Sequence, residues 1–139
     1  MKQKVIILTG ASSGIGYQTA KKLAKEGHII YGAARRIEKM ETLKAFGVKP
    51  LLMDVTSEES INKAIETIIT TEGKIDVLVN NAGYGSYGAV EDVDIEEARK
   101  QFNVNLFGVA MLTKKVLPYM RQQGSGTIIN VGSMGGRLT

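Results

Sequence analysis

Val5-Ile6-Ile7-Leu8-Thr9-Gly10-Ala11-Ser12-Ser13-Gly14-Ile15-Gly16 is the stretch of sequence that decides the fold. Its first four residues are apolar and mostly β-branched, which is typical of a buried strand. Three glycines then mark a tight turn, and the helix-like segment 17–26 follows. The sequence therefore predicts a strand, a glycine-rich turn and a helix in direct succession.

The glycine-rich turn has the properties of a phosphate cradle. Gly10 and Gly14 allow the backbone to approach a pyrophosphate, and Gly16 allows the helix to pack close to the strand. The start of the helix presents unpaired N–H groups to an anion. A tight turn without a ligand is the alternative reading. The residues expected to hold the diphosphate of a dinucleotide are Gly10, Ser12, Ser13, Gly14, Ile15 and Gly16.

The rest of the chain alternates apolar runs with helix-like segments. Strand-like runs occupy 5–8, 29–34, 50–53, 75–79 and 127–131. This alternation predicts an α/β fold, a doubly wound parallel sheet of the Rossmann type with about five strands. We expect residues 1–139 to form one dinucleotide-binding domain, with its ligand at the carboxyl ends of the strands.

Local signals place the helices between these strands. Thr56 with Glu59 and Asp94 with Glu97 have the spacing of a capping box. Residues 95–122 are predicted to form one long helix, in which Asn105 is a buried amide on the core-facing side. Glycines expected to end helices are Gly27, Gly47, Gly73 and Gly124. The predicted core-facing stripe of the long helix is Ala98, Phe102, Asn105, Val109, Leu112 and Val116.

Composition narrows the class of protein. The 139 residues are 43% hydrophobic, enough for one core, and no stretch approaches the length of a membrane span. Residues 1–49 carry 10 Lys or Arg against 3 acidic residues, whereas residues 50–139 carry 8 against 11. These charges are dispersed, so we expect no nucleic-acid partner. The chain has no cysteine, no metal site is expected, and a cytoplasmic location is the simplest expectation.

The residues after the second and third strands suggest how a dinucleotide would be recognised. Ala34 stands where an acidic residue would bind the ribose 2′-hydroxyl of NAD, and Arg35 and Arg36 follow at once. Two guanidinium groups suit a 2′-phosphate, so NADP(H) is preferred over NAD(H), unless these are ordinary surface arginines. Asp54 is placed to accept a hydrogen bond from adenine or to cap the next helix, and Val55 to pack on the ring.

Asn80-Asn81-Ala82-Gly83 follows the fourth strand and, together with the glycine spacing, resembles the short-chain dehydrogenase/reductase family. The resemblance spans essentially all 139 residues and corresponds to the amino-terminal portion of a typical member. Residues 83–88 and 124–126 are most similar to the 17β-hydroxysteroid dehydrogenase-like branch. The resemblance implies that the first Asn ties the sheet together, whereas Asn81, Ala82 and Gly83 contact the cofactor.

The family resemblance also implies catalytic roles. Ser133, after the fifth strand, would polarise the substrate carbonyl, and Asn105 would position a water molecule in a proton relay. The acid/base Tyr-x-x-x-Lys of the family is expected a dozen or so residues beyond Ser133, with the substrate-binding region. Tyr17 and Lys21 have that spacing, but they are interpreted as a surface pair on the first helix.

The expected function is that of an NADP(H)-dependent oxidoreductase acting on a small-molecule carbonyl or secondary alcohol, with the cofactor-binding part present here. The chain as given lacks the Tyr and Lys, so it is expected to be inactive by itself. A nucleotide-binding module without turnover is the alternative. The resemblance implies a homo-oligomer, a dimer or tetramer, and the apolar surface left by an incomplete domain predicts self-association.

Overall fold

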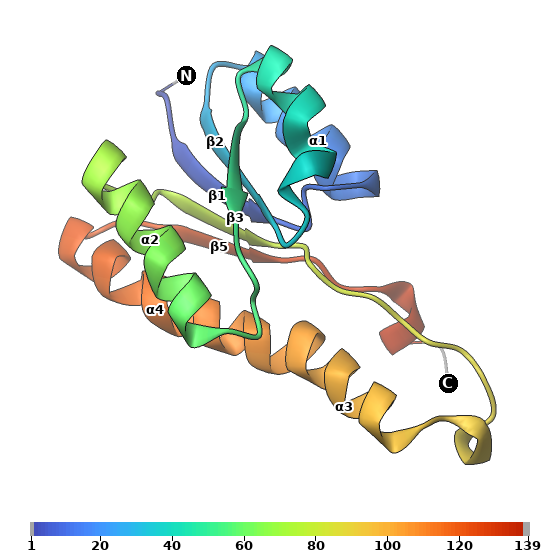
Figure 1. The fold of residues 1–139 in the computed structure, drawn as a ribbon. Coiled ribbons are helices and arrows are strands. Elements are labelled where there is room, and N and C mark those ends of the chain that lie inside the picture. Colours follow the sequence, from blue (N-terminus) through green and yellow to red (C-terminus); the bar gives the residue numbers. More distant parts are fainter. Residues whose placement is uncertain (1, 138–139) are drawn as a thin grey trace.

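The five predicted strands form one parallel sheet in the computed structural model, which describes residues 2–137 (Figure 1). The strands are β1 (Val5–Thr9), β2 (Ile29–Ala34), β3 (Lys49–Leu52), β4 (Val77–Asn80) and β5 (Thr127–Asn130). Their order across the sheet is β3-β2-β1-β4-β5. The winding direction therefore reverses between β1 and β4, and a ligand is expected at the carboxyl ends of these two strands.

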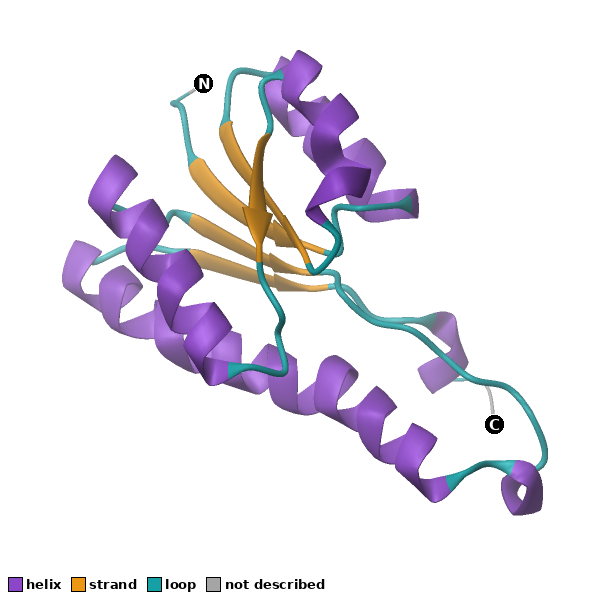
Figure 2. Ribbon diagram, viewed as in Figure 1, coloured by secondary structure: helices purple, strands orange, loops and turns teal. Residues whose placement is uncertain are grey.

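Helices cover both faces of the sheet, as the doubly wound prediction requires (Figure 2). One face carries α1 (Gly14–Lys25) and the 3₁₀ segment Ile37–Phe46, and the other carries α2 (Glu58–Glu72) and α4 (Val109–Gln123). Helix α3 (Ile95–Phe102) extends beyond the sheet (Figure 1). Two short 3₁₀ turns lie at Val90–Asp92 and Met134–Gly136.

Successive side chains of β1 point to opposite faces of the sheet, and the core therefore has two layers. Val5 and Ile7 pack with residues of α2 and α4, whereas Ile6 and Leu8 pack with residues of α1 and the 3₁₀ segment. All four side chains are buried because β1 is central and covered on both sides. The continuous apolar run at 5–8 is therefore the signature of a strand with no solvent-exposed face.

Helix ends agree with the sequence in most places. Gly27, Gly47, Gly73 and Gly124 all adopt positive φ angles where helices end, as predicted. Asp94 caps α3, and its Oδ1 accepts a hydrogen bond from the Glu96 N–H at 2.7 Å.

The capping box predicted at Thr56 and Glu59 is wrong. The cap of α2 is Ser57, whose Oγ accepts a hydrogen bond from the Ser60 N–H at 3.2 Å. Thr56 belongs instead to the turn before the helix, where its N–H and its hydroxyl both donate to Asp54 Oδ1, at 2.9 and 2.7 Å. The turn after β3 therefore moves the start of the helix one residue along the chain.

The single long helix predicted at 95–122 contains a π-helical segment, Asn103–Gly108, between α3 and α4. A π turn adds a residue to the helix and rotates everything beyond it by about 100° relative to a regular helix. Leu112 and Val116 are buried as predicted, but Phe102 is 57% exposed and Asn105 is also exposed. The prediction that these two residues face the core is therefore wrong.

The helices within residues 2–137 are short or carry many polar side chains. None of them combines the length and the apolar character needed to cross a membrane.

Candidate functional site

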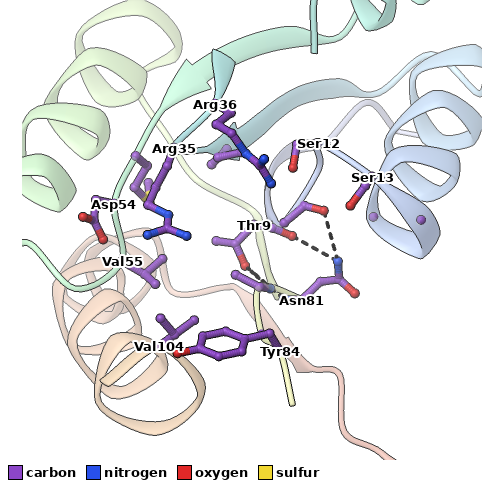
Figure 3. A pocket seen from close by; sticks show the side chains of 18 of the residues that line it. Thr9, Ser12, Ser13, Arg35, Arg36, Asp54, Val55, Asn81, Tyr84 and Val104 are labelled. Atoms are coloured by element: carbon purple, nitrogen blue, oxygen red, sulfur yellow. Dashed lines mark hydrogen bonds between the residues drawn. The ribbon is translucent and has the colours of Figure 1, made fainter. Parts of the chain in front are cut away.

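A cavity of about 450 Å³ lies at the carboxyl ends of β1, β2, β3 and β4 (Figure 3). Every residue that the sequence predicts for cofactor binding lines this cavity. They come from the turn after β1 (Gly10, Ser12, Ser13, Gly14, Ile15, Gly16), from the ends of β2 and β3 (Arg35, Arg36, Asp54, Val55) and from the segment after β4 (Asn81, Ala82, Gly83). The fold thus brings the segments that follow four strands together, and their role in binding stays a prediction.

The glycine-rich turn is shaped by close approaches of backbone to backbone. A Cβ atom at Gly16 would lie 2.2 Å from the Gly10 carbonyl oxygen, so no side chain fits there. A Cβ atom at Gly10, where φ is +68°, would lie 3.0 Å from Ala82 Cα. At Gly14, φ is +55° and the space next to the missing Cβ is open. The turn is therefore crowded at Gly10 and Gly16, whereas Gly14, which lines the cavity, has open space beside it.

The start of α1 is not capped by its own sequence. The N-cap residue Ser13 makes no side-chain capping hydrogen bond, and the first turn contains no acidic residue. The positive end of the helix dipole at the cavity is therefore not neutralised by a neighbouring carboxylate. This arrangement suits an anionic ligand.

Thr9 connects the glycine turn to the loop after β4. Its Oγ1 accepts hydrogen bonds from the N–H groups of Asn81 and Ala82, each at 2.9 Å, and donates to the Val79 carbonyl at 3.4 Å. The Asn81 Nδ2 donates to the carbonyl of Thr9 at 3.2 Å (Figure 3). These bonds fix the two loops on either side of the point where the winding reverses.

The Asn80 side chain has a structural position. It is buried, and its Nδ2 donates to Thr113 Oγ1 at 3.1 Å and to Asn130 Oδ1 at 2.9 Å. These bonds join β4 to α4 and β5. Asn80 therefore ties the sheet together, while Asn81 lines the cavity.

The charged groups of the site are Arg35, Arg36 and Asp54. Both guanidinium groups are exposed at the cavity, and neither forms an ion pair within residues 2–137. Partial burial opposes ionisation of Asp54, but the two hydrogen bonds from Thr56 and the nearby charge of Arg35 lower the pKa of this carboxyl. Asp54 is consequently an anion that accepts hydrogen bonds, and its turn leads into α2.

The two predicted catalytic residues lie outside the cavity lining. Asn105 is in the π-helical segment, where its Oδ1 accepts from the Tyr84 N–H at 3.1 Å and its Nδ2 donates to the Tyr84 carbonyl at 2.7 Å. Ser133 follows β5, and its Oγ accepts from the Gly135 N–H at 3.1 Å. Asn105 is therefore a backbone clamp on the loop after β4, not a buried core amide.

Tyr17 does not belong to the site. Its hydroxyl forms a hydrogen bond of 2.7 Å with Thr42 Oγ1, in the 3₁₀ segment. Neither Tyr17 nor Lys21 lines the cavity. The position of this pair agrees with its interpretation as a surface pair.

Several residues that line the cavity were not predicted from the sequence: Thr9, Ala33, Met53, Tyr84 and Val104. Thr9 carried a usable signal, because it is the polar end of an apolar strand in contact with the glycine turn. Tyr84 and Val104 carried none, since a long-range contact between the loop after β4 and the π-helical segment brings them to the cavity.

Comparison with known proteins agrees with this architecture. The sequence profile of a family described as "short chain dehydrogenase" matches residues 4–139. A 3-ketodihydrosphingosine reductase from Bacteroides thetaiotaomicron is 46% identical over 136 residues, which cover 98% of this chain and 49% of the relative. The chain therefore spans about half the length of that relative.

Solved structures are similar over almost the whole chain. A short-chain dehydrogenase from Streptomyces avermitilis superposes with a TM-score of 0.93 at 39% identity, covering 99% of this chain and 52% of its own. An alcohol dehydrogenase from Thermococcus sibiricus, complexed with 5-hydroxy-NADP, gives 0.87 at 30% identity and coverages of 99% and 62%. An NAD⁺-bound xylitol dehydrogenase gives 0.88 at 35% identity and coverages of 96% and 54%. Structures similar to this chain thus hold both types of nicotinamide dinucleotide.

Proposed function

Because the chain belongs to the short-chain dehydrogenase family, we propose that its cavity binds NADP(H) in preference to NAD(H). We further propose that it is the cofactor-binding part of an oxidoreductase acting on a carbonyl or a secondary alcohol. The observation that carries this proposal is the single cavity in which the glycine turn, the two arginines and the loop after β4 meet.

The residues of the cavity suit a dinucleotide in shape and charge. A volume of about 450 Å³ is in the usual range for small-molecule sites. The open side of Gly14 and the uncapped start of α1 would receive the diphosphate, since backbone N–H groups and the helix dipole favour negative charge there. Asp54 and Val55 would contact the adenine, and Asn81 to Gly83 the adjoining ribose.

The preference for NADP(H) is supported by the end of β2. Ala34 has no carboxylate to accept a hydrogen bond from a 2′-hydroxyl or to repel a 2′-phosphate. Arg35 and Arg36 bring two positive charges to the cavity, against the one carboxylate of Asp54. A guanidinium offers several donors in a rigid plane, which is suited to a phosphate group.

In the proposed reaction, a bound nicotinamide supplies the hydride chemistry. The roles proposed for this chain's own residues are those implied by its family. Ser133 Oγ would donate a hydrogen bond to the substrate oxygen, and Asn105 would position a water molecule for proton transfer. The acid/base pair that the family implies, a Tyr four residues before a Lys, is proposed to belong to the whole protein.

Three finer properties are also proposed. The loops at 83–88 and 124–126 support placement in the 17β-hydroxysteroid dehydrogenase-like branch. Homo-oligomerisation is supported by apolar side chains exposed on α3 and the π-helical segment. The cytoplasmic location expected from the sequence stays a prediction.

A nucleotide-binding module without turnover is the second candidate function, because the chain spans about half of its relative's length while its cavity draws on the segments that follow four strands. Isothermal titration with NADPH and NADH, followed by an NADPH oxidation assay with simple aldehydes and ketones, tests both candidates. We expect NADPH to bind more tightly than NADH. Binding without oxidation would favour the module, and failure to bind either dinucleotide would contradict both candidates.

A further inference from the structure

Tyr84 lies at the junction of the nucleotide cavity and a second cavity. Its side chain lines both of them, as do those of Arg35 and Val104. The second cavity, of about 410 Å³, is also lined by charged and polar residues of the neighbouring elements: Thr56, Glu97, Lys100 and Asn103. Tyr84 therefore borders the proposed nucleotide site, where Figure 3 shows its ring beside Val104.

Tyr84 is held in position by contacts with residues that do not line the nucleotide cavity. Asn105 bonds both the N–H and the carbonyl of Tyr84, at 3.1 and 2.7 Å. At the other end of the residue, loss of solvent and the adjacent Glu97 carboxylate raise the pKa of the Tyr84 hydroxyl, while Arg35 opposes them. The hydroxyl therefore stays protonated at neutral pH, at the second cavity that Glu97 also lines.

Two valines complete an apolar surface next to the ring. Val55, which follows β3, and Val104, in the π-helical segment, line the same cavity as Tyr84 (Figure 3). Val55 is fixed from behind by the π-helical segment, because a Cβ atom at Gly108 would lie 2.8 Å from Val55 Cγ2. An aromatic ring and two branched side chains are suited to a flat, weakly polar group.

Resting on the proposed nucleotide binding, we propose that the ring of Tyr84 is an aromatic wall of the adenine subsite and positions the purine of the cofactor. Its neighbours place it at that end of the cavity. Arg35 and Val55 follow β2 and β3, whereas Ser133 follows β5 and does not line the cavity. Tyr84 is therefore a positioning residue for adenine, and Asn105 supports it through the backbone.

ADP-ribose is the probe that tests this role, because it contains adenine and diphosphate but no nicotinamide. Titration calorimetry would compare the wild-type chain with Tyr84→Ala, Tyr84→Leu and Tyr84→Phe. Loss of aromatic stacking on a base weakens binding by roughly 5- to 150-fold. We expect the Ala and Leu variants to lose ADP-ribose affinity in this range, and NADPH affinity by a similar factor. The Phe variant keeps the ring and should stay within about threefold of wild type.

Tyr87→Ala is the matched control, since Tyr87 lies on the same loop, is 99% exposed and does not line the cavity. Its ADP-ribose affinity should equal that of wild type. Circular dichroism would verify that each variant is folded, and Tyr84→Leu keeps an apolar side chain at the site if Tyr84→Ala does not fold. Wild-type affinity for ADP-ribose in Tyr84→Leu would overturn the proposal. Absence of any nucleotide binding by the wild-type chain would instead overturn the proposed function on which it rests.

Discussion

Arg35 and Arg36 are adjacent in sequence but extend to different parts of the cavity. Figure 3 shows Arg35 near Asp54 and Val55, and Arg36 toward Ser12. Both follow Ala34, so no acidic side chain of that position neutralises them. The proposed preference for a 2′-phosphate thus rests on individual side chains at the end of β2 and not on the fold.

Replacement of Arg35 by Ala tests this preference. We expect Arg35→Ala to weaken NADPH binding by about 1–3 kcal/mol through loss of a charge-assisted contact, and NADH binding much less. Calorimetric titration of both dinucleotides measures the difference, and Arg36→Ala should be compared in the same way. Lys39→Ala is a control, because Lys39 is an exposed cation nearby that does not line the cavity. Equal losses for NADPH and NADH would contradict the assignment.

Residues with a local signature could be predicted from the sequence, and residues placed by distant contacts could not. Gly10, Gly14 and Gly16 are recognisable because their spacing lies within one turn. Asn105 was expected to be buried, yet it is exposed and bonds the backbone of Tyr84, 21 residues earlier. No sequence pattern connects Asn105 with Tyr84, so their hydrogen bonds can be seen only in the folded chain.

At the scale of elements, strands were the most predictable parts. Their β-branched, continuously apolar runs reflect burial on both faces, and each of the five strands lies where it was expected, to within two residues at either end. The π-helical segment was not predicted. One additional residue in a turn changes which side chains share a face of the helix, but it leaves the amino-acid composition typical of a regular helix. Helix α2 begins one residue later than predicted, because Thr56 is part of a turn in which it donates two hydrogen bonds to Asp54. The capping-box spacing does not reveal that turn.

One polar cluster links three elements, and its contribution to stability depends on pH. The Tyr31 hydroxyl and the Lys49 ammonium both donate to Glu72 Oε1, at 2.8 and 2.5 Å, joining β2 and β3 to the end of α2. These two hydrogen bonds lower the pKa of Glu72 against a smaller effect of burial. The folded pKa is therefore below the unfolded pKa, and the stabilisation is lost as pH falls through the folded value.

Glu72→Gln should accordingly lower the free energy of unfolding by about 1 kcal/mol at pH 7.5, a modest value because Lys49 is half-exposed. The difference from wild type should shrink toward zero at pH 3, where Glu72 is protonated in the unfolded chain and increasingly so in the folded one. Urea unfolding at both pH values measures it. Glu66→Gln, an exposed position on the same helix, should show no such change, and a pH-independent effect of Glu72→Gln would contradict the mechanism.

In the whole molecule, the two core layers on either side of β1 are well covered, but β5 and one side of the long helical stretch are not. Phe102, Leu106 and Phe107 are 57%, 52% and 57% exposed and lie close together in sequence across the junction of α3 and the π-helical segment. Three large apolar side chains at one place form a surface that favours association. Ile129, within β5, and Val131, directly after it, are also exposed and add to the apolar area of the chain.

We therefore predict that the chain self-associates and that Phe107→Asp weakens the association. Burial of a large apolar side chain contributes about 1.5–3 kcal/mol, so placing a charge there should raise the dissociation constant at least about tenfold. Sedimentation velocity over a range of concentrations measures this constant. Thr70→Asp introduces the same charge at an exposed polar position of α2 and should leave it unchanged. A wild-type chain that sediments as a monomer at every concentration would show that this apolar surface has no partner in a second copy of the chain.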